Sequence, residues 1–149
     1  MSGHAEIAQV WPRDGRIRLV GALHGERPAP GTAKDWRLLV VLRDGDATER
    51  EYPAPLDGTD GGFDVSFPVA DLIAGGLPVP AVWDLYLAGE SDSGPARLRA
   101  GRQLDDIKRK KNIMVFPAQP VAASGTKARV KPYYTIKDNL SVECLPDKA

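Results

Sequence analysis

The densest charge cluster of the 149-residue chain consists of four consecutive cations: Lys108, Arg109, Lys110 and Lys111. Adjacent like charges repel each other, so one interpretation is a solvated surface balanced by the preceding acids, Asp105 and Asp106. The same two acids suit the first turn of a short helix, where carboxylates are favourable. The alternative interpretation of the four cations is a patch that binds anions.

Three further residues downstream favour the anion-binding interpretation: Arg129, Lys131 and Tyr133. They alternate along one predicted strand, so their side chains would share a face, with a tyrosine ring among the cations. An aromatic ring gives a flat contact and flanking cations give charge, which suits a phosphorylated sugar polymer or a lipid head group. These three residues and the four consecutive cations are therefore the candidate anion- or glycopolymer-binding site. For Tyr134 we expect packing against a sheet.

The sequence carries none of the usual signatures of catalysis. It has no Gly-rich phosphate loop before a helix, no His-Glu-x-x-His, no cysteine pair and no Gly-x-Ser-x-Gly. His4 and His24 fall in expected surface segments, and nothing in the sequence selects a partner for either. Cys144 lies on the apolar face of a predicted strand, where a thiol acts as a small buried hydrophobe. We predict no catalytic residue and no cofactor.

One Gly-rich loop could hold a metal ion. It is flanked by Asp57, Asp60 and Asp64, and calcium prefers clustered carboxylates on flexible backbone. The spacing does not match the EF-hand pattern, and Asp-Gly pairs are also what ordinary turns require. We therefore predict a turn and no metal site.

The chain has 20 Lys plus Arg and 20 Asp plus Glu, so its formal net charge is zero. Such a balance argues against nucleic acid as a partner, because cations that neutralise phosphates supply most of that affinity. The charges are unevenly divided: residues 1–102 hold 15 acids and 11 bases, and residues 103–149 hold 5 acids and 9 bases. The basic C-terminal region suits an anionic partner.

A length of 149 residues fits one domain with a full core, and a single cysteine excludes an intrachain disulfide. No apolar stretch approaches the 20 residues or so that span a bilayer, and residues 1–9 lack the order of a signal peptide. We expect a cytoplasmic protein, with a peripheral position at the inner face of the membrane as an alternative.

The elements that position these residues are predicted to be strands. In the first part of the chain we expect strands near residues 7–11, 16–23, 36–43, 48–52, 63–67, 82–88 and 96–101. A hairpin turn is expected at Arg13-Asp14-Gly15, and one or two helical turns at 69–74 are the only helix expected there. Residues 36–43 have the continuous apolar run of a central strand, and the strand at 48–52 is expected at an edge of its sheet. Trp83, Leu85 and Leu87 share the buried face of their strand. Residues 1–102 thus predict an all-β, immunoglobulin- or fibronectin-like sandwich of seven strands.

Residues 103–149 predict a basic connection followed by about three added strands, within a single domain spanning 1–149. The connection at 103–111 is polar or a short helix, and strands are expected at 112–116 and 128–136 with a flexible segment at 122–125. A turn at Asp138-Asn139 leads into a last strand, whose Leu140, Val142 and Cys144 share a face. Because an isolated hairpin is marginal in water, these strands are expected to extend a sheet or cover one end of the sandwich.

Four segments carry a resemblance to a known family: WDLYL at 83–87, RLRAGRQLDDIK at 97–108, KK at 110–111 and KPYYTIKDNLSV at 131–142. The chain resembles a β-sandwich accessory region of bacterial glycosyltransferases related to the CDP-glycerol glycerophosphotransferases, which build teichoic-acid-type cell-wall polymers. The likeness is firm over about 82–144 and looser before that. It implies association with a catalytic transferase domain or subunit, and no transferase chemistry within these 149 residues.

Three hypotheses follow for the function. The first is a non-catalytic sandwich module of a cell-wall glycopolymer transferase, as a domain or a separate protein. The second is an independent binding protein that recognises an anionic glycan, a lipid surface or a protein. The third is an enzyme whose site no motif reveals, since fold does not fix function.

Overall fold

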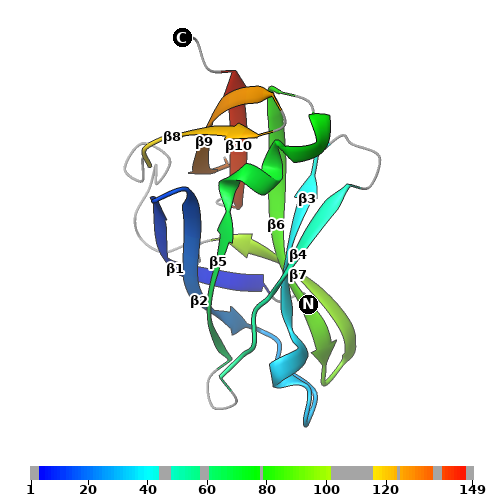
Figure 1. Cartoon of the computed structure of the whole chain (residues 1–149). Coiled ribbons are helices and arrows are strands. Elements are labelled where there is room, and N and C mark those ends of the chain that lie inside the picture. Colours follow the sequence, from blue (N-terminus) through cyan, green and yellow to red (C-terminus); the bar gives the residue numbers. More distant parts are fainter. Residues whose placement is uncertain are drawn as a thin grey trace.

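The computed structural model of the chain is built almost entirely of strands (Figure 1). The structure describes residues 4–43, 48–57, 61–77, 79–101, 116–123, 125–135 and 139–146. Within them, the only helical elements are three short 3-10 turns: η1 (Ala33–Asp35), η2 (Val69–Leu72) and η3 (Ala74–Gly76). The predicted all-β class is confirmed, and so are the helical turns near 69–74. The expectation of no other helix in the first hundred residues is wrong, because η1 is present there. Its three residues are too few to leave a periodic pattern in the sequence.

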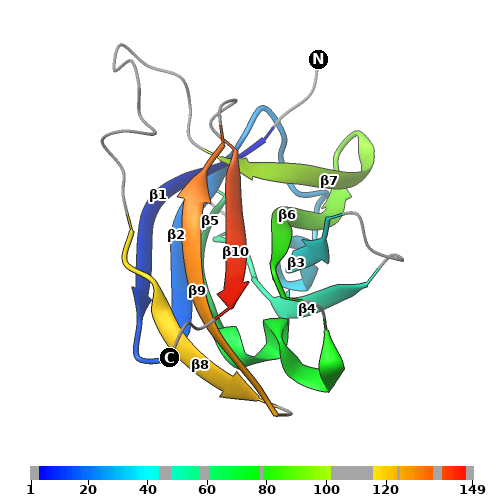
Figure 2. The same cartoon turned by 90° about the horizontal axis from the view of Figure 1, so that it is seen from above.

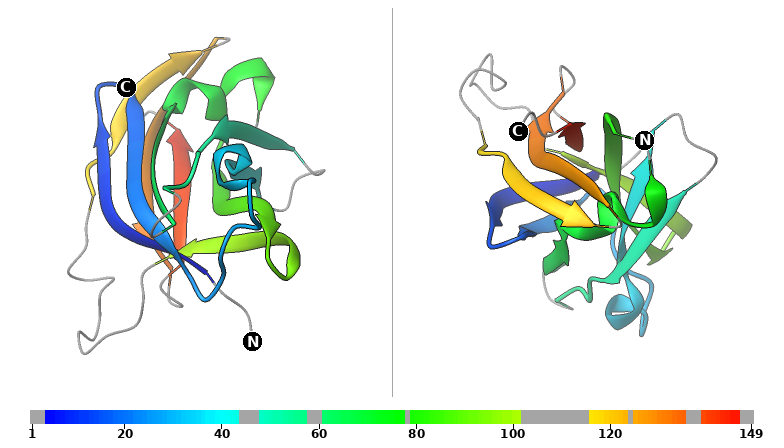
Figure 3. Two further views of the ribbon diagram at one scale, coloured as in Figure 1. Left: turned by 90° about the horizontal axis from the view of Figure 1, so that it is seen from below. Right: turned by 45° about the horizontal axis from the view of Figure 1, so that its top comes forward.

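The described part of residues 1–101 contains seven strands: β1 (His4–Arg13), β2 (Arg16–His24), β3 (Arg37–Leu42), β4 (Glu49–Pro53), β5 (Gly62–Pro68), β6 (Ala81–Ser91) and β7 (Gly94–Gly101). They form two antiparallel groups, β5-β2-β1 and β4-β3-β6-β7. A short parallel pairing of β1 with β7 joins the groups. Figures 2 and 3 show the groups as facing layers, as in a sandwich. As predicted, β3 is central, and β4 pairs with β3 alone.

The core lies between the two layers, where the inward side chains of both meet. Trp83, Leu85 and Leu87 of β6 are fully buried, as the two-residue alternation predicted. Phe63, Val65 and Phe67 form the matching buried row on β5. The same core continues into the C-terminal strands. Side chains at both ends of the chain therefore share one core.

Among the residues described after β7, three form strands: β8 (Gln119–Ala123), β9 (Thr126–Tyr134) and β10 (Leu140–Pro146). Ala122 and Ala123 belong to β8 and pair with β9, so the predicted flexible segment at 122–125 is wrong there. Pro120, two residues before this segment, disfavours a strand, but β8 is the last strand of the sheet, and an edge tolerates proline. The predicted strand at 112–116 lies outside the described residues except for Phe116, which is not in a strand.

The C-terminal strands both extend a sheet and cover one end of the sandwich (Figure 1). β10 pairs with residues 81–84 of β6, on the edge that β7 occupies over residues 86–91. At the covered end, the Gln119 side-chain amide accepts a hydrogen bond from Gly15 N at 2.8 Å and donates one to Arg16 O at 2.8 Å. Since Gln119 is buried, it fixes the β1–β2 turn to β8.

Candidate functional site

The described part of the predicted site lies on the outer face of β9. Arg129, Lys131 and Tyr133 alternate with buried residues along that strand, as predicted. Arg129 is exposed, and the Lys131 ammonium lies 3.5 Å from a carboxylate oxygen of Glu143 on β10. Lys108, Arg109, Lys110 and Lys111 lie outside the described residues. The strand therefore presents two exposed cations, Lys127 and Arg129, together with the paired Lys131 and a tyrosine on one face. Tyr134 is buried, as expected.

Next to Tyr133 lies a polar group that the sequence analysis did not predict. We call it the junction cluster, and its members are Arg43, Asp84, Arg99 and Ser141. Arg43 Nη2 donates to Asp84 Oδ1 at 2.7 Å, and Arg99 Nη2 donates to the same oxygen at 2.9 Å. The Ser141 hydroxyl donates to that oxygen at 2.8 Å. One carboxylate on β6 thus joins β7 and β10 to the residue that follows β3.

The Arg99 guanidinium lies where β7 leaves the edge of β6 and β10 begins. Its Nη1 donates to Leu85 O at 3.2 Å and to Leu140 O at 2.5 Å. Leu85 falls in the gap between the two ladders, so no strand partner on that edge reaches its carbonyl. Unpaired buried backbone oxygens are unfavourable, and the arginine supplies the missing donor. Its role in the junction cluster is structural.

The charges of the junction cluster shift each other's titration. Burial alone would raise the pKa of Asp84, but hydrogen bonds from Arg43 and Ser141 and the charge of Arg99 outweigh burial and lower it. Burial lowers the pKa of Arg99, while Asp84 opposes that shift. The hydrogen bond to Asp84 raises the pKa of Arg43, to which the neighbouring Tyr133 adds a smaller contribution. The network therefore keeps Asp84 as an anion held by two cations.

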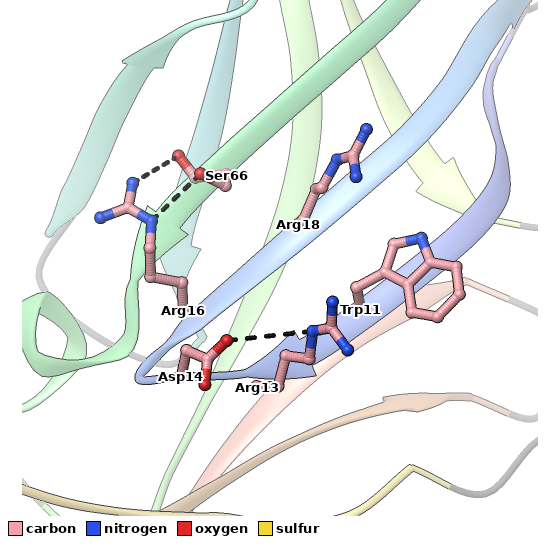
Figure 4. A pocket seen from close by; sticks show the side chains of 6 residues that line it. All are labelled: Trp11, Arg13, Asp14, Arg16, Arg18 and Ser66. Atoms are coloured by element: carbon pink, nitrogen blue, oxygen red, sulfur yellow. Dashed lines mark hydrogen bonds and ion pairs between the residues drawn. The ribbon is translucent and has the colours of Figure 1, made fainter.

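A second group of cations lies on the opposite sheet, at the β1–β2 hairpin, around a surface pocket of about 290 Å³ (Figure 4). We call it the hairpin pocket; its lining residues are Trp11, Arg13, Asp14, Arg16, Arg18 and Ser66. In Figure 4, Arg18 lies between Arg16 and the Trp11 indole. An aromatic ring among several cations is the chemistry predicted for the C-terminal region.

Sequence reasoning missed this pocket, although part of its signal was present. The predicted hairpin turn is confirmed: Asp14 and Gly15 have φ of 58° and 74°, which a tight two-residue turn requires. Because Arg13 and Arg16 flank that turn, the pairing Arg13↔Arg16 follows from it. The outward position of Trp11 does not follow, since it depends on a bulge in β1.

Other groups that could do chemistry are engaged in structure. Cys144 is fully buried, and burial raises the pKa of its thiol to about 12, as expected of a small hydrophobe. Both Asp64 carboxylate oxygens accept hydrogen bonds from Arg18, at 2.8 and 2.6 Å. The His4 and His24 rings lie 5.0 Å apart, and burial is the main cause of the lowered pKa of His4. In the described ranges, no three His, Cys, Asp or Glu side chains gather as a metal site would need.

The comparisons with known proteins concern the fold. No family model matches the chain, and no curated protein matches its sequence. Two similar solved structures are those of S. aureus TarS residues 217–571, with a TM-score of 0.74 and 15% identity, and of S. aureus TarS, with a TM-score of 0.70 and 15% identity. They match 100% and 97% of this chain, which spans 40% and 25% of their lengths. No helix in the described part is long and apolar enough to cross a membrane.

Proposed function

We propose that this chain is a non-catalytic β-sandwich module of a bacterial cell-wall glycosyl- or glycerophosphotransferase that makes teichoic-acid-type polymers. The observation that carries the proposal is the fold match to TarS over the whole chain. The segments at 83–87, 97–108 and 131–142 separately resemble transferases that make teichoic-acid-type polymers. This chain spans well under half of the matched TarS chains, so its partner would be a catalytic transferase domain or subunit.

The polar groups of the described residues support a role without catalysis. Asp84 is held by two arginines and a serine, and Asp64 by one arginine. The Cys144 thiol is buried with a raised pKa, whereas a reactive cysteine needs a lowered one. These groups stabilise strand junctions or fill the core.

In this proposal the module binds the anionic polymer through the C-terminal cations. Arg129 is exposed on β9, and the predicted site adds Lys108, Arg109, Lys110 and Lys111 from the connection before β8. Several cations along a repeating phosphate chain give weak contacts that sum by multivalency. The location proposed is cytoplasmic, with the module at the inner face of the membrane where the polymer is made.

We also propose an immunoglobulin- or fibronectin-like assignment for the sandwich. Its support is the pairing of the first seven strands, in which a three-strand sheet β1-β2-β5 faces a four-strand sheet β4-β3-β6-β7. Strands that pair in this order share the architecture of that broad class of sandwiches.

A titration with a glycerol phosphate oligomer tests polymer binding. We expect weak binding that falls sharply between 0.1 and 1 M salt, because the screening length falls from about 10 Å to about 3 Å. A variant with Lys108, Arg109, Lys110 and Lys111 all changed to Ser should bind less. Equal binding by both proteins, or none at low salt, would contradict the proposed surface. Transfer of glycerol phosphate by this chain alone from CDP-glycerol would contradict the non-catalytic role.

A further inference from the structure

Trp11 faces solvent because β1 contains a bulge. The pairing of β1 with β2 shifts register between Ile7 and Gln9, and Ala8 is the extra residue. Before the bulge, Ala5 and Ile7 are buried; after it, Trp11 is turned outward and is 45% exposed. A bulge re-aims side chains in this way, and such features are enriched next to binding sites. Trp11 is the one large hydrophobic side chain that the described part of the molecule exposes.

The strand opposite the bulge accommodates it. Gly21 pairs with Ile7, and a Cβ at that position would collide with the Glu6 carbonyl oxygen. Beyond the bulge, the register places Trp11 opposite Arg18 and Arg13 opposite Arg16. Like charges directly across two strands are unfavourable, so the pair Arg13–Arg16 weakens the hairpin in isolation. An anion bound between the two guanidinium groups would reverse that effect.

The acids near the hairpin pocket do not neutralise all three arginines. Arg18 is paired with Asp64, and Arg13 lies 3.9 Å from Asp14 with both side chains largely exposed. Arg16 is held by serine: its Nε donates to Ser66 Oγ at 3.1 Å and its Nη2 to Ser66 O at 3.3 Å (Figure 4). Among the described residues, no carboxylate pairs with Arg16. The pocket therefore contains an oriented guanidinium with uncompensated charge.

Two of the groups that would touch a ligand, Trp11 and Arg16, are held in place by hydrogen bonds. Trp11 Nε1 donates to Gln9 Oε1 at 3.0 Å, which orients the indole. Gln119 of β8 fixes the backbone of the hairpin turn at Gly15 and Arg16. Binding groups that are positioned beforehand lose less entropy when a ligand arrives.

We infer that the hairpin pocket binds a phosphorylated sugar unit. The indole of Trp11 offers a flat apolar surface for the C–H face of a sugar ring. The guanidinium groups of Arg16 and Arg13 supply the charge-assisted hydrogen bonds that phosphate oxygens accept. About 290 Å³ lies at the lower end of ligand-pocket volumes, which suits one repeat of a polymer rather than a nucleotide-sugar. The inference rests on the proposed function for the polymer class, but it uses another sheet and other residues.

Tryptophan fluorescence tests this site directly. Trp36 and Trp83 are buried, at 1% and 0% exposure, so acrylamide should quench mainly Trp11. Glucose 1-phosphate should protect Trp11 from quenching, whereas glucose or inorganic phosphate alone should protect it at least tenfold less well at equal concentration. The Arg16→Gln variant should bind glucose 1-phosphate about tenfold more weakly, because it loses charge-assisted hydrogen bonds.

Two controls separate this site from the C-terminal surface. Arg37→Gln removes a half-buried cation on β3, paired there with Glu51, and should leave the protection of Trp11 unchanged. The variant with residues 108–111 changed to Ser should bind glucose 1-phosphate like the wild type even if it loses the oligomer. No protection by glucose 1-phosphate, unchanged binding by Arg16→Gln, or equal protection by phosphate alone would overturn the inference. Concentration-dependent shielding of Trp11 without ligand, together with a dimer in light scattering, would instead assign the face to self-association.

Discussion

The junction cluster and the hairpin pocket both contain arginines, but these arginines serve opposite purposes. At the junction, the Arg99 side chain is 20% exposed, and its hydrogen bonds go to a carboxylate, a serine and carbonyls of three strands. At the hairpin, the Arg13 side chain is 76% exposed beside an outward-facing tryptophan. Arginine at the junction is part of the scaffold, and arginine at the hairpin is available to a ligand.

Burial and bonding partners, not residue type, therefore separate a structural charge from a binding charge. Removing one partner from a buried ion pair leaves an unpaired charge and is strongly unfavourable. Removing one partner from an exposed ion pair changes the free energy of unfolding little. The two regions therefore predict different responses to matched substitutions.

The largest effect is expected from truncation after Gln103, which removes every strand that follows β7. It would strip β10 from the edge of β6 and expose core positions that Val142 and Cys144 now cover. Large exposed apolar areas promote aggregation. We expect an insoluble or non-cooperatively folding product, measured by yield, light scattering and thermal unfolding. A monomer that unfolds as cooperatively as the full chain would show that residues 104–149 are an appendage.

Two tryptophans give the next comparison. Trp83→Ala should lower the free energy of unfolding by about 3–5 kcal/mol, since it removes a fully buried side chain and leaves a cavity. Trp11→Ala should leave the denaturation midpoint nearly unchanged, because that indole is exposed. Urea denaturation of both variants measures the contrast. A Trp83→Ala variant with an unchanged melting temperature would contradict the position of Trp83 in the core.

The same two tryptophans show how far the sequence predicts the fold. Trp83 lies in a strand with unbroken alternation, so its burial could be predicted from Leu85 and Leu87. In β1, alternation counted from buried Ile7 would place Trp11 inside, and only the bulge at Ala8 reverses it. A bulge depends on the partner strand, here on close approach at Gly21, and no local pattern encodes that contact.

The candidate site was predictable only in part, for a similar reason. Alternation placed Arg129, Lys131 and Tyr133 on one face of β9, but the Glu143 partner of Lys131 comes from the pairing of β9 with β10. The junction cluster joins residues up to 98 positions apart through strand pairing. Only the topology brings such groups together.

Asp84 of the junction cluster and Asp64, the partner of Arg18 in the hairpin pocket, test the comparison at the level of single charges. Asp84→Ala should lower the free energy of unfolding by about 3 kcal/mol, because Arg99 would keep a mostly buried charge without its anion. Asp64→Ala should leave the melting temperature almost unchanged, since the Arg18–Asp64 pair is about half exposed. Calorimetry on both variants checks this. Similar losses in both would contradict the division into scaffold and surface charges.

Gln119 tests whether β8 supports the hairpin pocket. Gln119→Ala removes two hydrogen bonds to the turn and leaves Gly15 N and Arg16 O without that partner. We expect a loss of about 1–3 kcal/mol in the free energy of unfolding. Amide hydrogen exchange should also rise at Gly15 more than at β6. Unchanged exchange at Gly15 would show that the turn holds its shape without β8.

The smallest expected effect is on the free energy of unfolding at acidic pH. The pKa of Asp84 is lowered from its ordinary value of 3.8, so between the two values the unfolded chain binds more protons than the folded one. The contribution of Asp84 is therefore complete above about pH 4 and is lost as pH falls through its folded pKa. The Asp84→Asn variant should lose stability less steeply below pH 4 than the wild type.

Hydrogen bonds from Arg18 also lower the pKa of Asp64, but that pair is exposed and should be screened in 1 M salt. Denaturation at pH 2.5–5 in 0.1 and 1 M salt should thus find the Asp84 contribution at both salts and the Asp64 contribution at low salt only. Equal salt sensitivity of the two would place both carboxylates in the same kind of environment.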